Sequence, residues 1–197
     1  MITQTGRPKK DPENVRRRLL NSTASLMTNR GFAGVSVSDI ANDAGVTKGG
    51  LFHHFASKQE LIAAVFEDEL ERFSKQIDKF FAAEPPAYGC FTRAYIRATL
   101  VTVTDKTPTA ALTFSLCSEP ELMLRWNNWL SRRLTQHHDT DAAPELEIAR
   151  LAADGIWFTS LLAGRTLDNK ENLFRLQQRL IASTMESSEK NNHSSEF

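Results

Sequence analysis

Residues 36–58 read SVSDIANDAGVTKGGLFHHFASK, and this stretch decides the fold. Ser36 precedes an apolar stripe and has Asp39 three residues later, which is the capping pattern of a helix start. Gly45 can turn the chain where that stripe ends, and Thr47 can cap a second short helix. We therefore expect two short helices joined by a tight turn, the layout of a helix-turn-helix.

The second short helix carries an unusual surface. We expect Leu51, Phe52 and Phe55 to form its apolar face, and the remaining small, polar and basic residues to lie largely outside. No carboxylate occurs from Lys48 to Lys58. The same pattern could form an ordinary helical hairpin in a bundle, but the shortness of the helix and the missing carboxylates favour a helix that enters the major groove of DNA.

At this point a family resemblance is clear. SVSDIANDAGVTKGGLFHHFASKQEL, residues 36–61, resembles the DNA-binding signature of the TetR family of transcriptional regulators. The resemblance implies an all-α protein in which a three-helix head is joined by a long helix to a C-terminal helical ligand-binding and dimerisation bundle, with about nine helices in all. It also implies a homodimeric repressor that a small molecule releases from a palindromic operator.

The resemblance places the DNA contacts at positions of the motif, and a basic arm adds one more. The candidate DNA-binding residues are Arg7, Ser36, Thr47, Lys48, Gly49, Gly50, Phe52, His53, His54 and Lys58. This sequence departs from the family pattern where Gly50 replaces the usual Thr or Ser and Phe52 replaces the usual Tyr. A hydroxyl contact is missing at each, so we expect sequence preference to depend on Lys48, His54 and the arm.

Charge is distributed unevenly along the 197 residues, although the formal net charge is zero. Residues 1–58 hold nine Lys and Arg against four Asp and Glu, a balance of +5, so the remainder carries −5. A basic head on an acidic body is typical of a protein that orients toward a polyanion. Gly6-Arg7-Pro8 resembles a minor-groove hook, with a disordered basic tail as the alternative.

Helical periodicity and Pro or Gly breaks divide the chain into parts. We expect a flexible basic arm over 1–12, a helix-turn-helix domain over 13–58, a ligand-binding and dimerisation domain over 59–186, and a disordered tail over 187–197. A long helix capped by Ser57 should pass residue 80. Five helices should follow, over 88–104, 107–117, 120–138, 144–164 and 169–185, with no sheet.

The body contains aromatic and flexible side chains of the kind that line small-molecule cavities, although an ordinary packed core is an equal alternative. The candidate ligand-binding residues are Phe91, Tyr95, Phe114, Met123, Trp126, Asp154, Trp157 and Phe158. A carboxylate with aromatic neighbours suits an organic cation, which makes a hydrophobic cation a candidate effector. The alternative is that Asp154 pairs with Arg150, four residues earlier on the same helix.

The last two helices have more apolar surface than one core needs, which predicts a homodimer interface. Its candidate residues are Leu151, Leu161, Leu173, Leu176, Leu180 and Ile181. Cys90 and Cys117 should be reduced and buried, with a redox pair as the minor alternative.

Several functions find no support in the sequence. Residues 137–141, HHDTD, have metal-ligating types, but adjacent histidines diverge on a helix, so we expect a solvated loop and no metal. No catalytic set or cofactor motif can be assembled, and no segment is long and apolar enough to span a bilayer, so we expect a cytoplasmic protein that is not an enzyme. Two rivals are kept: a DNA-binding protein whose body is a protein-interaction platform, and an enzyme that uses the helix-turn-helix only as a scaffold.

Overall fold

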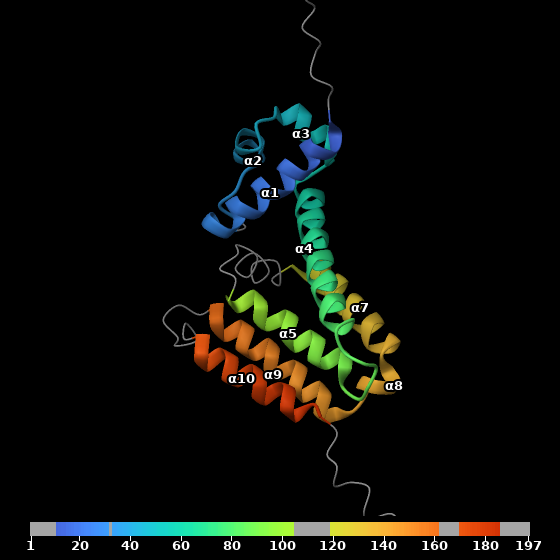
Figure 1. Ribbon diagram of the computed structural model, residues 1–197. Helices are drawn as coiled ribbons and strands as arrows, with labels where there is room; N and C mark the ends of the chain where they lie inside the picture. The colour runs from blue at the N-terminus through green and yellow to red at the C-terminus, as the bar shows by residue number, and fades with distance from the viewer. Residues whose placement is uncertain (1–10, 32, 105–118, 162–169, 186–197) are drawn as a thin grey trace, which may run out of the picture. The chain divides into compact units, whose positions relative to one another are not determined.

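The computed structural model describes residues 11–31, 33–104, 119–161 and 170–185 (Figure 1). Within these ranges the chain forms nine helices and no strand, which confirms the all-α prediction. Nearly all of the expected arm with Arg7, the expected helix over 107–117 with Phe114 and Cys117, and the tail over 187–197 lie outside the described residues. None of the helices in the described part is both long and apolar enough to cross a membrane.

The chain divides into two compact units, Met1–Glu67 and Asp68–Phe197, and the division falls inside one helix. The first unit holds α1 (Pro12–Arg30), α2 (Val37–Asp43), α3 (Lys48–His54) and the beginning of α4 (Lys58–Phe81). Local interactions set the ends of these helices. Asp11 caps the start of α1, and Gly31 and Gly45 have the positive φ angles that end α1 and turn the chain after α2.

The core of the first unit is built from the apolar stripes of its four helices. Its fully buried side chains are Leu19 and Met27 of α1, Ile40 of α2, Leu51 of α3, and Leu61 of α4, together with Phe55. The guanidinium of Arg16 lies 5.1 Å from the centre of the Phe55 ring, a cation–π contact between α1 and the end of α3. The orientation of α3 is therefore fixed by packing on one side and by its caps at both ends.

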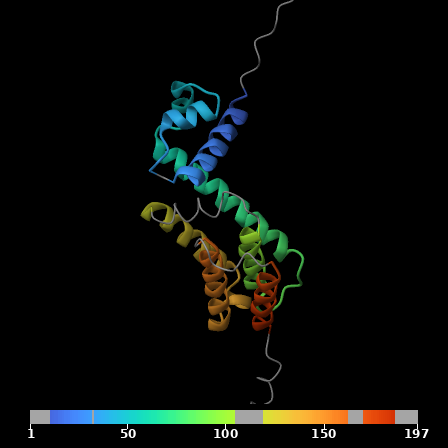
Figure 2. The ribbon, with the colours of Figure 1, turned by 90° about the vertical axis from the view of Figure 1, so that its left-hand side faces the viewer.

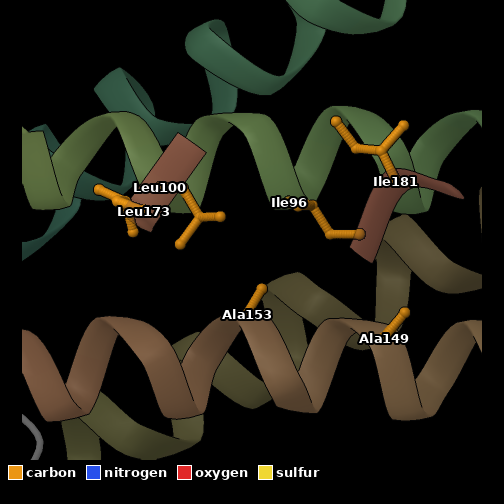
Figure 3. Packing of buried hydrophobic residues seen from close by; sticks show 6 residues of the cluster. All are labelled: Ile96, Leu100, Ala149, Ala153, Leu173 and Ile181. Atoms are coloured by element: carbon orange, nitrogen blue, oxygen red, sulfur yellow. The ribbon is translucent and has the colours of Figure 1, made fainter. Parts of the chain in front are cut away.

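The second unit contains α5 (Cys90–Thr104), α7 (Pro120–Gln136), α8 (His138–Asp141), α9 (Pro144–Leu161) and α10 (Lys170–Ser183), together with the end of α4. α5 packs on α9 and α10, which also contact each other (Figure 1, and from the side in Figure 2). Figure 3 shows the cluster that joins them: Ile96 and Leu100 of α5 point toward Ala149 and Ala153 of α9, with Leu173 and Ile181 of α10. The alanines allow α5 and α9 to approach closely.

The segment expected to be a solvated loop is a short helix whose last residue is buried, whereas His138 and Asp139 are exposed as expected. Residues 138–141 form α8, and Asp141 is only 2% exposed. Its carboxylate accepts hydrogen bonds from the backbone N–H groups of Phe91 (3.2 Å) and Thr92 (2.8 Å) at the start of α5. The prediction was wrong for Asp141 because acidic residues were expected to be solvated, whereas a buried helix start needs an acceptor of this kind.

A second polar cluster joins the end of α4 to α5 and α10. Glu84 pairs with Arg93 and Arg97 of α5, and Arg93 also donates to the carbonyl oxygens of Tyr88 and Thr184. Burial alone would raise the pKa of Glu84, but the hydrogen bonds from the two arginines outweigh it and lower this pKa. Gly89 is required here, because a Cβ at this position would come within 2.7 Å of the Thr184 carbonyl oxygen.

Candidate functional site

The first candidate site is the outer face of α3. Ser36 and Asp39 form a complete capping box at the start of α2, and the Thr47 hydroxyl accepts a hydrogen bond of 3.0 Å from the Gly50 N–H. The hydrogen bonds from Ser36 also lower the pKa of Asp39. Both predicted caps are confirmed. Their hydroxyls hold the helix starts while Ser36 and Thr47 remain exposed.

The side chains of α3 alternate between buried and exposed positions with the period of a helix. Leu51 is fully buried and His54 partly so, whereas Lys48, Gly49 and His53 are exposed. Phe52 was expected on the apolar face with Leu51, but it is 49% exposed and lies four residues from Lys48 on the outer face. That expectation was wrong because Phe52 was assigned to the core on its apolar character alone. Leu51 and Phe55 are the buried apolar residues of this short helix.

Gly50 and Lys58 complete this surface. A Cβ at Gly50 would lie 3.3 Å from the Thr47 hydroxyl oxygen, a tight contact with the atom that caps α3. Lys58 is the first residue of α4, directly after Ser57, whose hydroxyl accepts from the Glu60 N–H. Glu60 in turn accepts from the Ala56 N–H, one residue before the expected partner in the capping box.

The second candidate site is a partly buried carboxylate in the bundle. The hydroxyl of Tyr95 on α5 donates a 2.7 Å hydrogen bond to Asp154 on α9. Burial raises the pKa of Asp154 to about 6, although the Tyr95 hydrogen bond and the charge of Arg150 oppose the shift. Burial and the negative charge of Asp154 together raise the pKa of Tyr95, so the tyrosine remains a neutral donor.

Arg150 does not neutralise Asp154 through an ion pair. Its guanidinium donates to the Thr92 hydroxyl (2.6 Å) and to the Asp141 carbonyl oxygen (3.4 Å), and burial lowers its pKa. Within the described residues, Asp154 forms no salt bridge, and its hydrogen bond is the one from Tyr95. The alternative that Asp154 pairs with Arg150 is therefore wrong. No cation of the described part of the chain is in direct contact with this carboxylate.

Aromatic rings from two further helices, α4 and α7, extend from the Tyr95–Asp154 pair. Phe73 of α4 makes an edge-to-face contact with Tyr95 at 5.7 Å between ring centres, and lies 5.8 Å from both Trp126 and Trp129 of α7. The two tryptophan rings are 5.2 Å apart. We call Phe73, Tyr95, Trp126, Trp129 and Asp154 the aromatic–carboxylate cluster. It offers ring faces and one negative charge.

The sequence identified only part of this cluster. Tyr95, Trp126 and Asp154 were candidates, but Phe73 was missed because its position in the apolar stripe of α4 gives no other signal. Trp129 follows Trp126 by three residues, the helical neighbour spacing that could have added it. The hydroxyl of Thr99, one turn after Tyr95, is buried and makes no hydrogen bond of normal geometry within the described residues.

Other candidate ligand residues have different surroundings. Phe91 is fully buried, 6.3 Å from Tyr95 between ring centres, and stacks on His137 at 4.7 Å. Burial, followed by the charge of Arg133, lowers the pKa of His137, so this ring is held as a neutral packing group. Met123 and Trp157 are partly buried, and Phe158 is 44% exposed.

The candidate dimer residues separate into two groups. Leu173 and Ile181 lie in the protomer's own core, so their assignment to an exposed interface is corrected. Leu151 is 62% exposed, and Leu176 and Leu180 are partly buried. The exposed large apolar side chains of this region are Ile148, Leu151 and Phe158 on α9, Phe174 on α10, and Met185 just after it. These exposed side chains are stronger candidates for an interface than Leu173 and Ile181.

Two family models match the chain. The model described as "Bacterial regulatory proteins, tetR family" covers residues 19–65, and the model described as "Tetracyclin repressor-like, C-terminal domain" covers residues 89–185. The first match contains α2 and α3, and the second contains α5 and α7 to α10.

Among curated proteins, the chain is 38% identical over 60 residues to the HTH-type transcriptional repressor KstR2 of Mycolicibacterium smegmatis, covering 30% of this chain and 29% of that one. It is 29% identical over 97 residues to the HTH-type transcriptional regulator TtgR of Pseudomonas putida, covering 46% and 44%. The chain thus spans less than half the length of either relative.

Solved structures share the fold over most of their length. The multidrug binding protein EbrR complexed with malachite green superposes with a TM-score of 0.69 at 18% identity, covering 87% of this chain and 98% of that one. A TetR family member from Streptomyces coelicolor superposes with a TM-score of 0.68 at 18% identity, covering 87% and 99%.

Proposed function

The chain belongs to the TetR family of transcriptional regulators, and from this premise we propose that it is a homodimeric repressor released from a palindromic operator by a small hydrophobic molecule. The observation that carries the DNA-binding half of the proposal is the outer face of α3. It exposes Lys48, Gly49 and His53 on a helix held by two caps, in a segment without a carboxylate from Lys48 to Lys58. A DNA partner also implies a cytoplasmic location.

The aromatic–carboxylate cluster supports a hydrophobic organic cation as the effector. Asp154 supplies a partly buried charge without an ion-pair partner in the described residues, and the rings of the cluster supply faces that attract a cation. Malachite green is a cationic dye, and a protein of the same fold was solved with it, which makes this dye a suitable probe. An electrically neutral ligand would leave the carboxylate without compensation.

The exposed apolar face of α9 and α10 supports pairing of two protomers. Leu151 of α9 and Phe174 of α10 are 62% and 60% exposed, and such side chains are candidates for burial between two protomers. A dimer is also what DNA reading requires, because one recognition helix reads only a few base pairs. Each α3 would enter the major groove of one half-site, with centres separated by ~34 to 36 Å.

Release follows from a link between the two sites. Phe73 belongs to α4, the helix that begins directly after the DNA-binding motif, and its ring contacts three members of the cluster. A cation that inserts between these rings must move Phe73, and with it α4. The resulting arrangement would hold the paired recognition helices away from the spacing of successive major grooves.

The decisive experiment begins with selection of bound duplexes from a random 30-base-pair library. The proposal expects a palindromic consensus and two-fold protection by the dimer. Tetraphenylphosphonium and malachite green should then release this duplex, whereas triphenylphosphine oxide, a neutral molecule of similar shape, should not. Protection of one half-site by a monomer would refute the dimer mechanism, and binding of DNA unaffected by any of these compounds would favour a regulator whose body serves as a protein platform.

A further inference from the structure

Phe52 is exposed where the rest of the head buries its large apolar side chains. Leu51 of α3 and Phe55, which directly follows α3, are almost completely buried, whereas Phe52 is 49% exposed. Within residues 11–31 and 33–67, Phe52 is the only large apolar side chain that is exposed. About half of the Phe52 side chain is therefore accessible to a partner.

The surroundings of Phe52 identify that partner. Lys48 lies one turn before it on the same face, and Gly49 and His53 occupy the adjacent exposed positions. These neighbours are basic or small, and the nearest carboxylates in the sequence lie outside the segment from Lys48 to Lys58. Basic residues around the ring do not favour an apolar protein surface as the partner. They favour DNA, because its phosphates make it a polyanion.

We propose that Phe52 is a specificity-determining residue that reads thymine through its C5-methyl group in the major groove. This proposal rests on the proposed binding of DNA by α3. Base edges in that groove present hydrogen-bond donors and acceptors, which a phenyl ring cannot use, and one apolar group, the methyl of thymine. A tyrosine at this position could also bond a phosphate, but Phe52 has no hydroxyl, so its contribution is confined to apolar contact.

Lys48 sets where that thymine lies. Lys48 and Phe52 are four residues apart, or about 6 Å along the helix axis, which corresponds to about two base-pair steps of 3.4 Å. A lysine prefers the O6 and N7 acceptors of guanine. The selected half-site should therefore place a guanine within about two base pairs of a thymine that is sensitive to the loss of its methyl group.

The test uses the full-length protein and the duplex selected from the random library. Each thymine of one half-site, and its symmetry mate, is replaced in turn by 2′-deoxyuridine, which removes only the methyl group. Wild-type protein should lose about fourfold affinity per half-site at one thymine position and none at the others. Phe52→Ala should bind the thymine and deoxyuridine duplexes equally, and Phe52→Tyr should retain the discrimination because it keeps the ring.

Each outcome decides the proposal. Equal affinity of wild-type protein for every deoxyuridine duplex would overturn it while leaving DNA binding intact. An unchanged methyl effect in Phe52→Ala would assign the contact to another residue and overturn it as well. If Phe52→Ala fails to fold by circular dichroism, Phe52→Ser in the same cycle replaces it. If wild-type protein selects no duplex at all, the DNA-binding function itself fails, and a change in oligomeric state of Phe52→Ala would indicate a protein partner instead.

Discussion

Replacing Asp154 by asparagine should make the protein more stable at neutral pH and unable to bind a hydrophobic cation. Burial raises the pKa of Asp154 from 3.8 to about 6, so the ionised form is disfavoured in the folded state. A shift of this size corresponds to about 3 kcal/mol of unfolding free energy at pH 8. Asparagine keeps an acceptor for the Tyr95 hydroxyl and carries no charge, so it relieves up to this amount.

The unfolding free energy should decrease as the pH rises, because the pKa of Asp154 is raised in the folded state. The folded-state pKa of Asp154 is raised, so its stabilising contribution is complete below pH 3.8 and is lost as the pH rises through about 6. The unfolding free energy of wild-type protein should therefore lose up to about 2.5 kcal/mol relative to Asp154→Asn between pH 4 and pH 8. The two proteins should be nearly equal in stability at pH 4.

Ligand binding should follow the opposite trend. With a pKa of about 6, the carboxylate of the empty site is about 90% ionised at pH 7 and about 9% ionised at pH 5. A permanent cation that binds the ionised form should therefore bind about tenfold more weakly at pH 5 than at pH 7. In Asp154→Asn its affinity should fall about 10- to 100-fold and become independent of pH, because a charge-assisted contact is lost.

Urea unfolding at constant protein concentration and calorimetric titration with tetraphenylphosphonium measure both effects. Asp141→Asn is the matched control, since Asp141 is also a buried carboxylate but caps α5 through two backbone N–H groups. That variant should lose about 1–2 kcal/mol of unfolding free energy and bind the cation normally. A destabilised Asp154→Asn at pH 8, or one that binds the cation as tightly as wild-type protein, would refute the reasoning.

Three further predictions concern coupling, DNA binding and pairing. Phe73→Leu should still bind both DNA and cation, but the ratio of DNA affinities without and with cation should shrink about fivefold, as measured by fluorescence anisotropy; an unchanged ratio would remove Phe73 from the link. Lys58→Ala should weaken binding to all duplexes and reduce the salt slope by about 1, whereas Lys48→Ala should also relax sequence preference, and equal effects would contradict these separate roles. Phe174→Glu should convert the dimer to a folded monomer in analytical ultracentrifugation, because its ring is 60% exposed in the protomer and a two-fold interface would lose about 3–6 kcal/mol from two copies; a persistent dimer would place the interface elsewhere.

The helix starts were predictable from sequence because capping is local. Ser36, Thr47 and Ser57 each bond a backbone N–H three residues ahead, so residue type and spacing alone define the contact. The ends at Gly31 and Gly45 were equally clear, because both adopt positive φ. These local rules placed the starts and ends of the helices in the head, but they did not predict the exposure of Phe52.

Burial in the body was not predictable in the same way, because it depends on which faces meet. Leu173 and Ile181 lie on the same apolar stripe of α10 as Leu176 and Leu180, yet the first pair packs into the protomer core and the second pair is only partly buried. Asp141 looked like a loop residue because nothing in its neighbourhood reveals the helix start that it caps, some 50 residues earlier in the chain. Such contacts join segments that the sequence pattern treats separately.

The pair Arg150 and Asp154 shows how this difference bears on function. Their spacing of four residues favours an ion pair, and a pair would have made Asp154 a structural residue with no need of a ligand. Arg150 instead bonds Thr92 on α5 and the end of α8, because a buried guanidinium gains more from several fixed acceptors than from one carboxylate on its own helix. Asp154 is then held by a neutral tyrosine in an aromatic environment, with its pKa raised because its charge is not fully compensated. The ligand charge proposed here therefore follows from where the arginine is directed, and a ligand that lacks a positive charge should leave the pKa of Asp154 near 6 when it binds.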